Sequence, residues 1–392
     1  MTIDTHILLA ASAGATLSVA TLAALMSWSQ RRINPSRAKL AIFFAVFALS
    51  EVDAVTKVLI QDLPQIVRDG SEFAGFAANF WLGPLFFVYL QDIACRWRKP
   101  DDKRSIARHL LLPSVATVFA IGTFALLEVT RDNLQAGRSS DLEALVLTVV
   151  HYGFLLLTIA LAVQWIVYVA LVFYTQVQHI DRLKQYFAST EGMELQWVSI
   201  LVCALGLYVL QHLIGQIMIL QGEQDLVGPL FDSFLVFVVV LALALWGLRP
   251  SPDLDRATRT LAEIETPKDS KYEKSALDAA QSGRIARKLV RAMEQDVLYR
   301  DPNLTLGMLA QHVGVSLNYV SQTLNQSLGQ SFFEFVNSWR IKEAMPLVAK
   351  GDATILAIAY EVGFNSRSSF YSAFKRETGQ TPTAFKSGTA GS

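Results

Sequence analysis

Seven long apolar blocks fill the first 250 residues, and they constrain this chain more than any other feature of its sequence. A membrane-spanning helix needs about 20 predominantly apolar residues. Only helices and closed barrels satisfy backbone groups in lipid, and apolar runs of this length are typical of helices. We therefore predict seven transmembrane helices, at residues 6–28, 39–61, 73–94, 109–129, 142–174, 195–221 and 229–248.

The composition separates a membrane half from a soluble half. The chain is 52% hydrophobic and 17% charged, whereas soluble proteins carry about 25% charged residues. The apolar excess lies before Pro250, and the chain after it has the composition of a soluble protein. The fifth block exceeds what a bilayer requires, which predicts a helix that is tilted or continues into the cytoplasm. Cys95 and Cys203 are too few for a disulfide scaffold.

The distribution of basic residues predicts the orientation. The loops after the first, third and fifth blocks carry 12 lysines and arginines, whereas the opposite loops carry only Arg68, Arg131 and Arg138. Positive residues gather on the cytoplasmic side. We therefore expect an N-terminus outside and a C-terminus in the cytoplasm, at the inner membrane if the host is a bacterium. No basic segment precedes the first block, which favours an uncleaved helix over a signal peptide.

Polar residues inside the predicted spans have two interpretations. Such residues are costly in lipid and often functional, and with this orientation they lie in the outer half of the bilayer. They could line an outward-facing pocket for a small-molecule or envelope signal, or they could simply hydrogen-bond between helices. The candidate ligand-sensing residues are Glu51, Asp53, His151, His212, Gln216 and Asp232.

A polar segment follows the last block and contains Pro252 and Pro267. A flexible tether of this length would reach roughly 30 Å, enough to let a small domain clear the membrane. It is either a spacer or a protease-sensitive release site, and the sequence does not choose. We predict three parts: a seven-span domain at 1–249, a cytoplasmic linker at 250–283 and a soluble domain at 284–388.

The soluble domain begins with a first helix–turn–helix pattern. An amphipathic helix is predicted at Arg284–Tyr299, before Asp301-Pro302. Thr305 can cap a short helix, Gly314 can provide a tight turn, and Ser316 can cap the next helix. The second helix of such a pair enters the major groove of DNA. The predicted inward positions are Leu306, Leu309, Ala310, Val313, Val320 and Leu324.

A second copy of the pattern follows. Thr354 and Ser366 can cap two further helices, with Gly363 at the turn between them. A long helix at about Phe332–Ala349 would join the copies and set the distance between the two recognition helices. Adjacent major grooves on one face of DNA lie about 34 Å apart. The predicted inward positions are Ile355, Ile358, Ala359, Val362, Phe370 and Phe374.

Two copies at this spacing resemble the AraC/XylS-type DNA-binding domain, and the resemblance covers about a quarter of the chain. It implies an all-α fold with two helix-turn-helix subdomains joined by a long helix. Pro346 in that helix departs from the family pattern and predicts a change in spacing or angle between the subdomains. The matching residues are Leu309-Ala310, Val313-Gly314-Val315-Ser316, Leu324, Gly329, Phe332, Phe335, Arg340, Ala344, Ile355, Ala359, Val362-Gly363-Phe364, Ser366, Ser368, Phe370, Phe374-Lys375, Gly379 and Pro382.

The resemblance also implies which residues meet DNA. Asparagine and glutamine suit adenine edges, and arginine suits guanine. Three further residues, Tyr319, Lys375 and Arg376, are candidates for phosphate or sugar contacts, which position without specifying. Basic residues outnumber acidic ones by 12 to 8 between Arg284 and Gly388, a mild bias compatible with DNA. The implied base-reading positions are Asn318, Ser321, Gln322, Arg367, Ser368 and Ser372.

Together these features predict a membrane-anchored transcription regulator that couples a signal to gene expression. Its expected partners are double-stranded DNA, the lipid bilayer, RNA polymerase, a small-molecule or envelope signal and a second copy of the chain as a homodimer. We expect no cofactor, no metal and no enzymatic activity, because no Walker loop, HExxH, GxSxG or Cys/His cluster occurs. The alternatives are a transporter-like or lipid-modifying membrane domain fused to a regulator, and an anchor with no sensing role.

Overall fold

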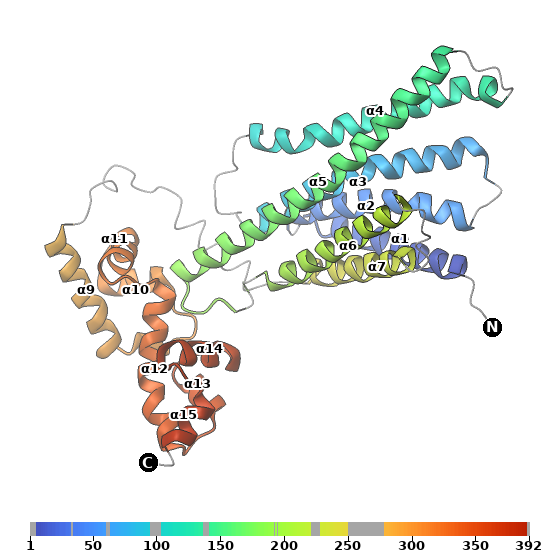
Figure 1. Cartoon of the computed structure of the whole chain (residues 1–392). Helices are drawn as coiled ribbons and strands as arrows, with labels where there is room; N and C mark the ends of the chain where they lie inside the picture. Colours follow the sequence, from blue (N-terminus) through green and yellow to red (C-terminus); the bar gives the residue numbers. More distant parts are fainter. Residues whose placement is uncertain are drawn as a thin grey trace. The chain divides into compact units, whose positions relative to one another are not determined.

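The computed structural model describes residues 5–32, 34–59, 63–94, 103–135, 141–191, 193, 195–220, 228–249 and 278–389. Within these residues the regular elements are helices, and the β-structure is limited to an isolated bridge between Phe187 and Thr305. The predicted all-α fold is confirmed (Figure 1). The chain divides into unit 1, Met1–Gln176 with Gln196–Pro250, and unit 2, Val177–Leu195 with Ser251–Ser392.

Unit 1 contains a long helix over each of the seven predicted apolar blocks. Five of them, α1, α3, α4, α5 and α7, are long and apolar enough to cross a membrane. Helix α2 carries more charged residues than such a membrane-spanning helix allows, and several side chains of α6 lie outside the described residues. A count of seven spans therefore stays a prediction. The helices are α1 Thr5–Ser29, α2 Ser36–Leu59, α3 Gln65–Ala94, α4 Lys103–Gln135, α5 Asp141–Tyr186, α6 Gln196–Leu220 and α7 Gly228–Gly247.

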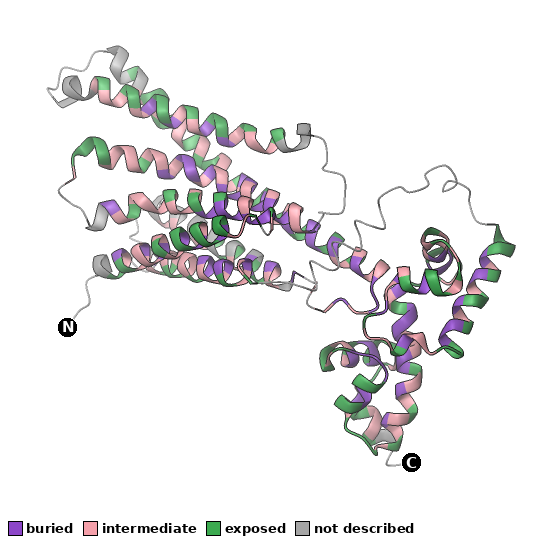
Figure 2. Ribbon diagram, turned by 180° about the vertical axis from the view of Figure 1, so that it is seen from behind, coloured by how far each residue is buried: buried purple, intermediate pink, exposed green. Residues whose placement is uncertain are grey.

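On α1, small residues face the inside of unit 1, whereas large apolar residues face outward. Ala20 and Ala23 of α1 are buried, while Leu22 and Leu25 beside them are exposed. Figure 2 shows exposed residues along the helices of this unit. Helix α5 has 46 residues and is therefore about 69 Å long at 1.5 Å per residue. It begins in unit 1 and ends in unit 2.

Unit 2 has the predicted order of helices. The first one spans Ala279–Glu294 instead of the expected Arg284–Tyr299. It ends before Tyr299 because Val297 adopts a left-handed conformation (φ 49°) that no helix can include. The elements are α9 Ala279–Glu294, a 3₁₀ turn Leu298–Arg300, α10 Leu306–Val313, α11 Leu317–Gln322, a π-helical turn Thr323–Ser327, α12 Phe332–Lys350, α13 Ile355–Glu361, α14 Arg367–Thr378 and α15 Pro382–Thr389.

Two separate apolar cores build two subdomains that share α12. Its N-terminal half gives Phe332, Phe335 and Val336 to the first core, which also holds residues of α9, α10 and α11. Its C-terminal half gives Ile341, Ala344 and Val348 to the second core, with residues of α13 and α14. Two helix-turn-helix subdomains joined by a long helix are therefore confirmed. Helix α12 runs unbroken through the exposed Pro346.

Residues 177–195, which the sequence does not connect with DNA binding, also belong to unit 2. They include the last turns of α5 and the segment that leads toward α6. Ala188 lies in the first core, and Tyr186 packs against it. The end of α5 is thus part of the folded C-terminal unit.

Candidate nucleic-acid interface

The first helix-turn-helix is fixed by its caps. The Thr305 hydroxyl accepts a hydrogen bond from the amide of Met308 (3.2 Å), at the start of α10. The Ser316 hydroxyl accepts one from the amide of Tyr319 (3.4 Å), at the start of α11. Gly314 closes α10 in the left-handed region (φ 64°), where a side chain is disfavoured. The caps and the turn are the ones that the sequence predicts.

The second helix-turn-helix repeats this arrangement. The Thr354 hydroxyl accepts a hydrogen bond from the amide of Ala357 (3.1 Å), and the Ser366 hydroxyl accepts one from the amide of Ser369 (3.2 Å). Gly363 has φ 98° at the turn. A Cβ atom on Gly363 would lie 2.7 Å from backbone oxygens of the preceding subdomain. Glycine is therefore required here by both conformation and space.

Arg340 of α12 joins the two subdomains from inside. It is fully buried, and its Nε and Nη2 donate to the carbonyls of Tyr299 (2.7 Å) and Asp301 (2.8 Å). The ring of Phe364 lies 5.3 Å from its guanidinium carbon. Burial lowers the pKa of Arg340 to about 10, so it stays charged at neutral pH. Because its partners precede α10 and α14, Arg340 positions both helix pairs on α12.

The base-reading candidates of the first recognition helix share one face. Asn318, Ser321 and Gln322 lie at i, i+3 and i+4 on α11, and Asn318 is exposed. The Gln322 amide donates to Oε1 of Gln326 (3.0 Å), and the Asn325 amide donates to the Ser321 hydroxyl (3.3 Å). The structure thus brings these three residues together, supported by two amides from the following π-helical turn.

The candidates of the second recognition helix lie on the exposed side of α14. Arg367, Ser368 and Ser372 are all exposed. The Arg367 guanidinium donates to the hydroxyl of Tyr371 (3.1 Å) and lies 4.8 Å from the centre of its ring. The Tyr371 hydroxyl in turn contacts Thr383 Oγ1 (3.1 Å). These contacts hold the guanidinium along the outer face of the helix.

The three phosphate candidates differ in their surroundings. Lys375 and Arg376 are exposed in the last turn of α14. Arg376 Nε lies 3.3 Å from a carboxylate oxygen of Glu377. Tyr319 is half-buried and packs against the first core, so only part of its ring faces outward.

The sequence did not predict the residues that support the base-reading candidates, which we call the readers. Tyr371 is the clearest case: its hydrogen bond with Thr383 and the nearby Arg367 cation lower the pKa of its hydroxyl. The i,i+4 spacing of Arg367 and Tyr371 was the available signal. Asn325 and Gln326 carried none, because a π-helical turn is not visible in a sequence pattern.

The predicted ligand-sensing residues are spread over unit 1. Asp53 on α2 accepts a hydrogen bond from the Ser71 hydroxyl of α3 (3.3 Å). His151 on α5 is exposed, with its ring 5.6 Å from that of Tyr152. Glu51 on α2 and Asp232 on α7 are half-buried, and the side chains of His212 and Gln216 lie outside the described residues.

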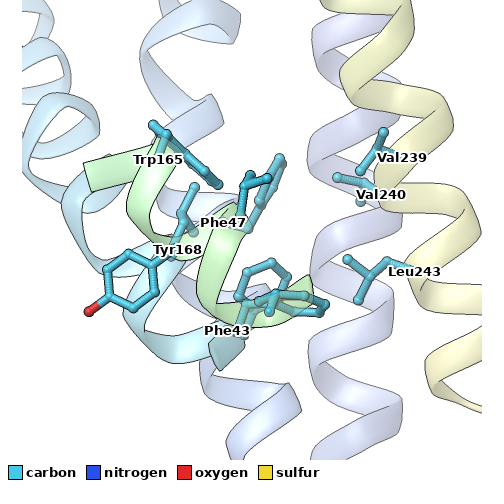
Figure 3. Close-up of a pocket in the computed structure, with 12 residues that line it drawn as sticks. Phe43, Phe47, Trp165, Tyr168, Val239, Val240 and Leu243 are labelled. Atoms are coloured by element: carbon cyan, nitrogen blue, oxygen red, sulfur yellow. The ribbon is translucent and has the colours of Figure 1, made fainter. Parts of the chain in front are cut away.

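A small apolar cavity lies among α2, α3, α5 and α7 (Figure 3), and none of those six residues lines it. Its volume is about 40 Å³, whereas ligand pockets measure about 300–1,000 Å³. The Tyr168 hydroxyl points away from the other labelled side chains and contacts His109 Nδ1 (2.9 Å). The lining residues are Phe43, Phe47, Leu82, Gly83, Phe86, Trp165, Tyr168, Val169, Val172, Val239, Val240 and Leu243.

Among the residues that the structure describes, no group of three or more His, Cys, Asp or Glu side chains could hold a metal ion. The geometry of unit 2 instead offers exposed amides, hydroxyls and guanidinium groups on two short helices. These are the groups that hydrogen-bond to base edges and phosphates.

Known proteins resemble the chain in this same region. The profile of a helix-turn-helix domain family matches residues 309–388. An uncharacterized HTH-type transcriptional regulator of Staphylococcus aureus (strain COL) is 37% identical over 89 residues, which is 23% of this chain and 12% of the relative. A putative AraC-like transcription regulator of Streptomyces lividans is 34% identical over 91 residues, or 23% of this chain and 30% of the relative.

A search of solved structures gives a similar match. The C-terminal domain of AraT, a response regulator from Geobacillus stearothermophilus, is 26% identical, with a TM-score of 0.25; the match covers 29% of this chain and 88% of that one. The match to the two curated relatives named above spans less than a third of their own length. From the profile match and the AraC-like relative, the C-terminal part of this chain is an AraC-type helix-turn-helix domain.

Proposed function

We propose that the chain is a sequence-specific DNA-binding transcription regulator that unit 1 holds in a membrane. The observation that carries this proposal is the pair of capped helix-turn-helix subdomains with exposed readers, chiefly Asn318 on α11 and Arg367 on α14. In such domains the second helix of each pair enters the major groove. Double-stranded DNA is then the principal partner, with RNA polymerase and a second copy of the chain as further partners.

The surface of unit 1 supports anchoring in lipid. Large apolar side chains such as Val118, Leu156 and Ile121 are between 64% and 71% exposed. Soluble monomers rarely expose large contiguous apolar patches. The basic loops after the first, third and fifth helices favour a cytoplasmic location for unit 2, where bacterial DNA lies.

Signal coupling is the finer part of the proposal. Polar residues in the outward half of unit 1 would contact a small-molecule or envelope signal, with Asp53, His151 and Asp232 as candidates beside Glu51, His212 and Gln216. A ligand can shift the protein only if it binds one arrangement more tightly than another. Helix α5 offers a direct connection, because it begins in unit 1 and ends in unit 2.

A chromatin-immunoprecipitation map of the intact chain in bacterial cells tests the proposal. We expect discrete occupied sites that share a sequence and that disappear in the Arg367→Ala variant. The Arg291→Ala variant, which removes an equally exposed cation from α9, is the matched control and should keep those sites. Occupancy without shared sites, or a C-terminal reporter that is active only outside the cytoplasm, would contradict it.

A further inference from the structure

The five residues Phe187–Glu191, which we call the strap, follow α5 directly and lie against the helix-turn-helix domain. Phe187 forms an antiparallel bridge with Thr305, and the Ala188 amide donates to the carbonyl of Leu304 (3.1 Å). Phe187 and Ala188 are only 4% and 1% exposed. The proximal end of the strap is therefore built into the first subdomain, immediately before α10.

The strap also supplies an acceptor to the connecting helix. The carbonyl of Ala188 accepts hydrogen bonds from the Asn337 amide and from Arg340 Nη1, both at 3.4 Å. Both side chains are buried. Buried donors such as these need partners. The strap is thus part of the polar network that positions the two subdomains on α12.

The distal end of the strap reaches the second recognition helix. The Asn365 amide donates to the Ser189 hydroxyl (3.1 Å), and the Ser366 hydroxyl donates to Oε1 of Glu191 (2.7 Å). Asn365 and Ser366 are the last two residues before α14. Ser189 and Glu191 are half-exposed and flank Thr190, which is 3% exposed, so release of this end exposes Thr190 while the proximal end stays in place.

The Glu191 carboxylate therefore lies at the N-terminus of a recognition helix. The N-terminus of a helix favours anions and is a common site for phosphate groups. The N-terminal residues of a recognition helix are also the ones that approach the bases and the flanking backbone of DNA. A carboxylate at this position, bound to the capping hydroxyl of Ser366, repels a second negative charge.

We propose that the strap is an intramolecular inhibitor of DNA binding, docked on the surface formed by Asn365, Ser366 and the α14 N-terminus. Docked, its Glu191 carboxylate competes with a DNA phosphate for that helix end. Release of Ser189–Glu191 frees the helix, and α5, which is joined directly to the strap, can control that release. The inference rests on the proposed function and names how the signal reaches DNA.

The first test removes the charge alone. Full-length Glu191→Gln protein in nanodiscs keeps an oxygen acceptor for Ser366 but no longer repels phosphate. We expect it to bind a selected duplex about threefold to fivefold more tightly, as for a partly exposed charge, with a gain that shrinks at high salt. Glu294→Gln removes an exposed carboxylate from α9 and should leave affinity unchanged. Equal affinity of wild type and Glu191→Gln overturns the inference.

The second test fixes the strap in place. Ser189→Cys and Asn365→Cys, in a background with Cys95→Ser and Cys203→Ser, place two thiols at contacting positions. A short bis-methanethiosulfonate cross-linker should lower DNA affinity about tenfold, within the range of allosteric couplings, and reduction should restore it. Unchanged affinity in the cross-linked protein overturns the inference alone. A wild-type chain that binds no duplex would overturn the proposed function as well.

Discussion

The two helix-turn-helix subdomains have the same architecture but present different chemistry on their recognition helices. In the first, the readers on α11 are uncharged, and Gln322 is held by a neighbouring amide. In the second, α14 carries three exposed cations, Arg367, Lys375 and Arg376. Amides recognise base edges without adding charge, whereas cations add affinity that depends on salt. We therefore expect α14 to contribute more salt-dependent attraction than α11, and α11 to contribute selectivity.

The turns of the two subdomains differ as well. Gly314 has open space around the position of a Cβ atom, whereas a Cβ atom on Gly363 would lie 2.7 Å from the carbonyl oxygens of Tyr299 and Arg300. The first turn is thus a local feature of the chain. The second is also a contact between subdomains, on the same segment that Arg340 binds. Mutations can separate these two roles.

The largest effect is expected from breaking the joint between the subdomains. Arg340→Met removes a buried cation that satisfies the carbonyls of Tyr299 and Asp301. Leaving buried acceptors such as these without a donor costs about 1–3 kcal/mol each. Arg300→Ala is the control, because the Arg300 side chain is half exposed (51%) where it pairs with Glu343, and such a pair near the surface is worth about 0–1 kcal/mol. Thermal unfolding followed by hydrogen exchange in unit 2 measures the loss of stability in both variants. Equal losses of stability would contradict the role of Arg340.

The next effect compares the two turns. Gly363→Ala forces a Cβ atom into backbone oxygens at 2.7 Å in a left-handed conformation (φ 98°), which we expect to cost about 3 kcal/mol or more. Gly314→Ala meets only the conformational strain, about 1–2 kcal/mol. Urea unfolding of the two variants is the measurement. A loss of stability in Gly314→Ala that matches or exceeds that in Gly363→Ala would show that the contact with the backbone oxygens does not destabilise the second turn.

The third effect separates the two reading chemistries. Arg367→Ala and Gln322→Ala should each weaken binding to a selected duplex by about 1–3 kcal/mol. Lys375→Ala, at a phosphate candidate on α14, should instead weaken binding to all duplexes about equally and reduce the slope of log affinity against log salt by about one unit. Fluorescence anisotropy over a salt series distinguishes them. Wild-type affinity in Arg367→Ala would mean that its guanidinium, beside Tyr371, does not reach DNA, and an unchanged slope in Lys375→Ala would mean that its ammonium contacts no phosphate.

The smallest effect concerns the helix caps. Ser316→Ala and Ser366→Ala each remove one hydroxyl that accepts an amide hydrogen bond and should cost about 1 kcal/mol of stability. Only Ser366→Ala also removes a donor to Glu191. Hydrogen exchange of the strap should therefore quicken in Ser366→Ala and stay unchanged in Ser316→Ala. Equal exchange in both variants would contradict the docking of the strap on the second subdomain.

Local patterns predicted most of unit 2. The caps Thr305, Ser316, Thr354 and Ser366 fall where the sequence places them, because each is set by three or four neighbouring residues. The buried positions of α10 to α14 follow from the 3.6-residue period. The end of α9 was not predictable in this way, because its apolar period continues past the left-handed Val297.

Contacts between distant segments could not be predicted. The Ala188 carbonyl meets Arg340 across 152 residues, and no local pattern records such a pairing. The visible signal was weak: Leu183 and Phe187 continue an apolar spacing beyond the fifth apolar block, and both are buried. Arg182 and Lys184 made the same stretch resemble a cytoplasmic loop. The positions of the base-reading residues on their helices were predictable, whereas the hydrogen bond by which Tyr371 supports Arg367 depends on the fold.

The central claim is that unit 2 reads a specific DNA sequence while unit 1 lies in lipid. Duplex selection with the full-length chain reconstituted in nanodiscs tests it most directly. The account predicts one enriched sequence motif at moderate salt, bound at least about a thousandfold more tightly than random DNA and lost in Arg367→Ala. A nanodisc-embedded chain that retains no duplex over random competitor would contradict it, as would a chain that stays monodisperse in water without lipid or detergent.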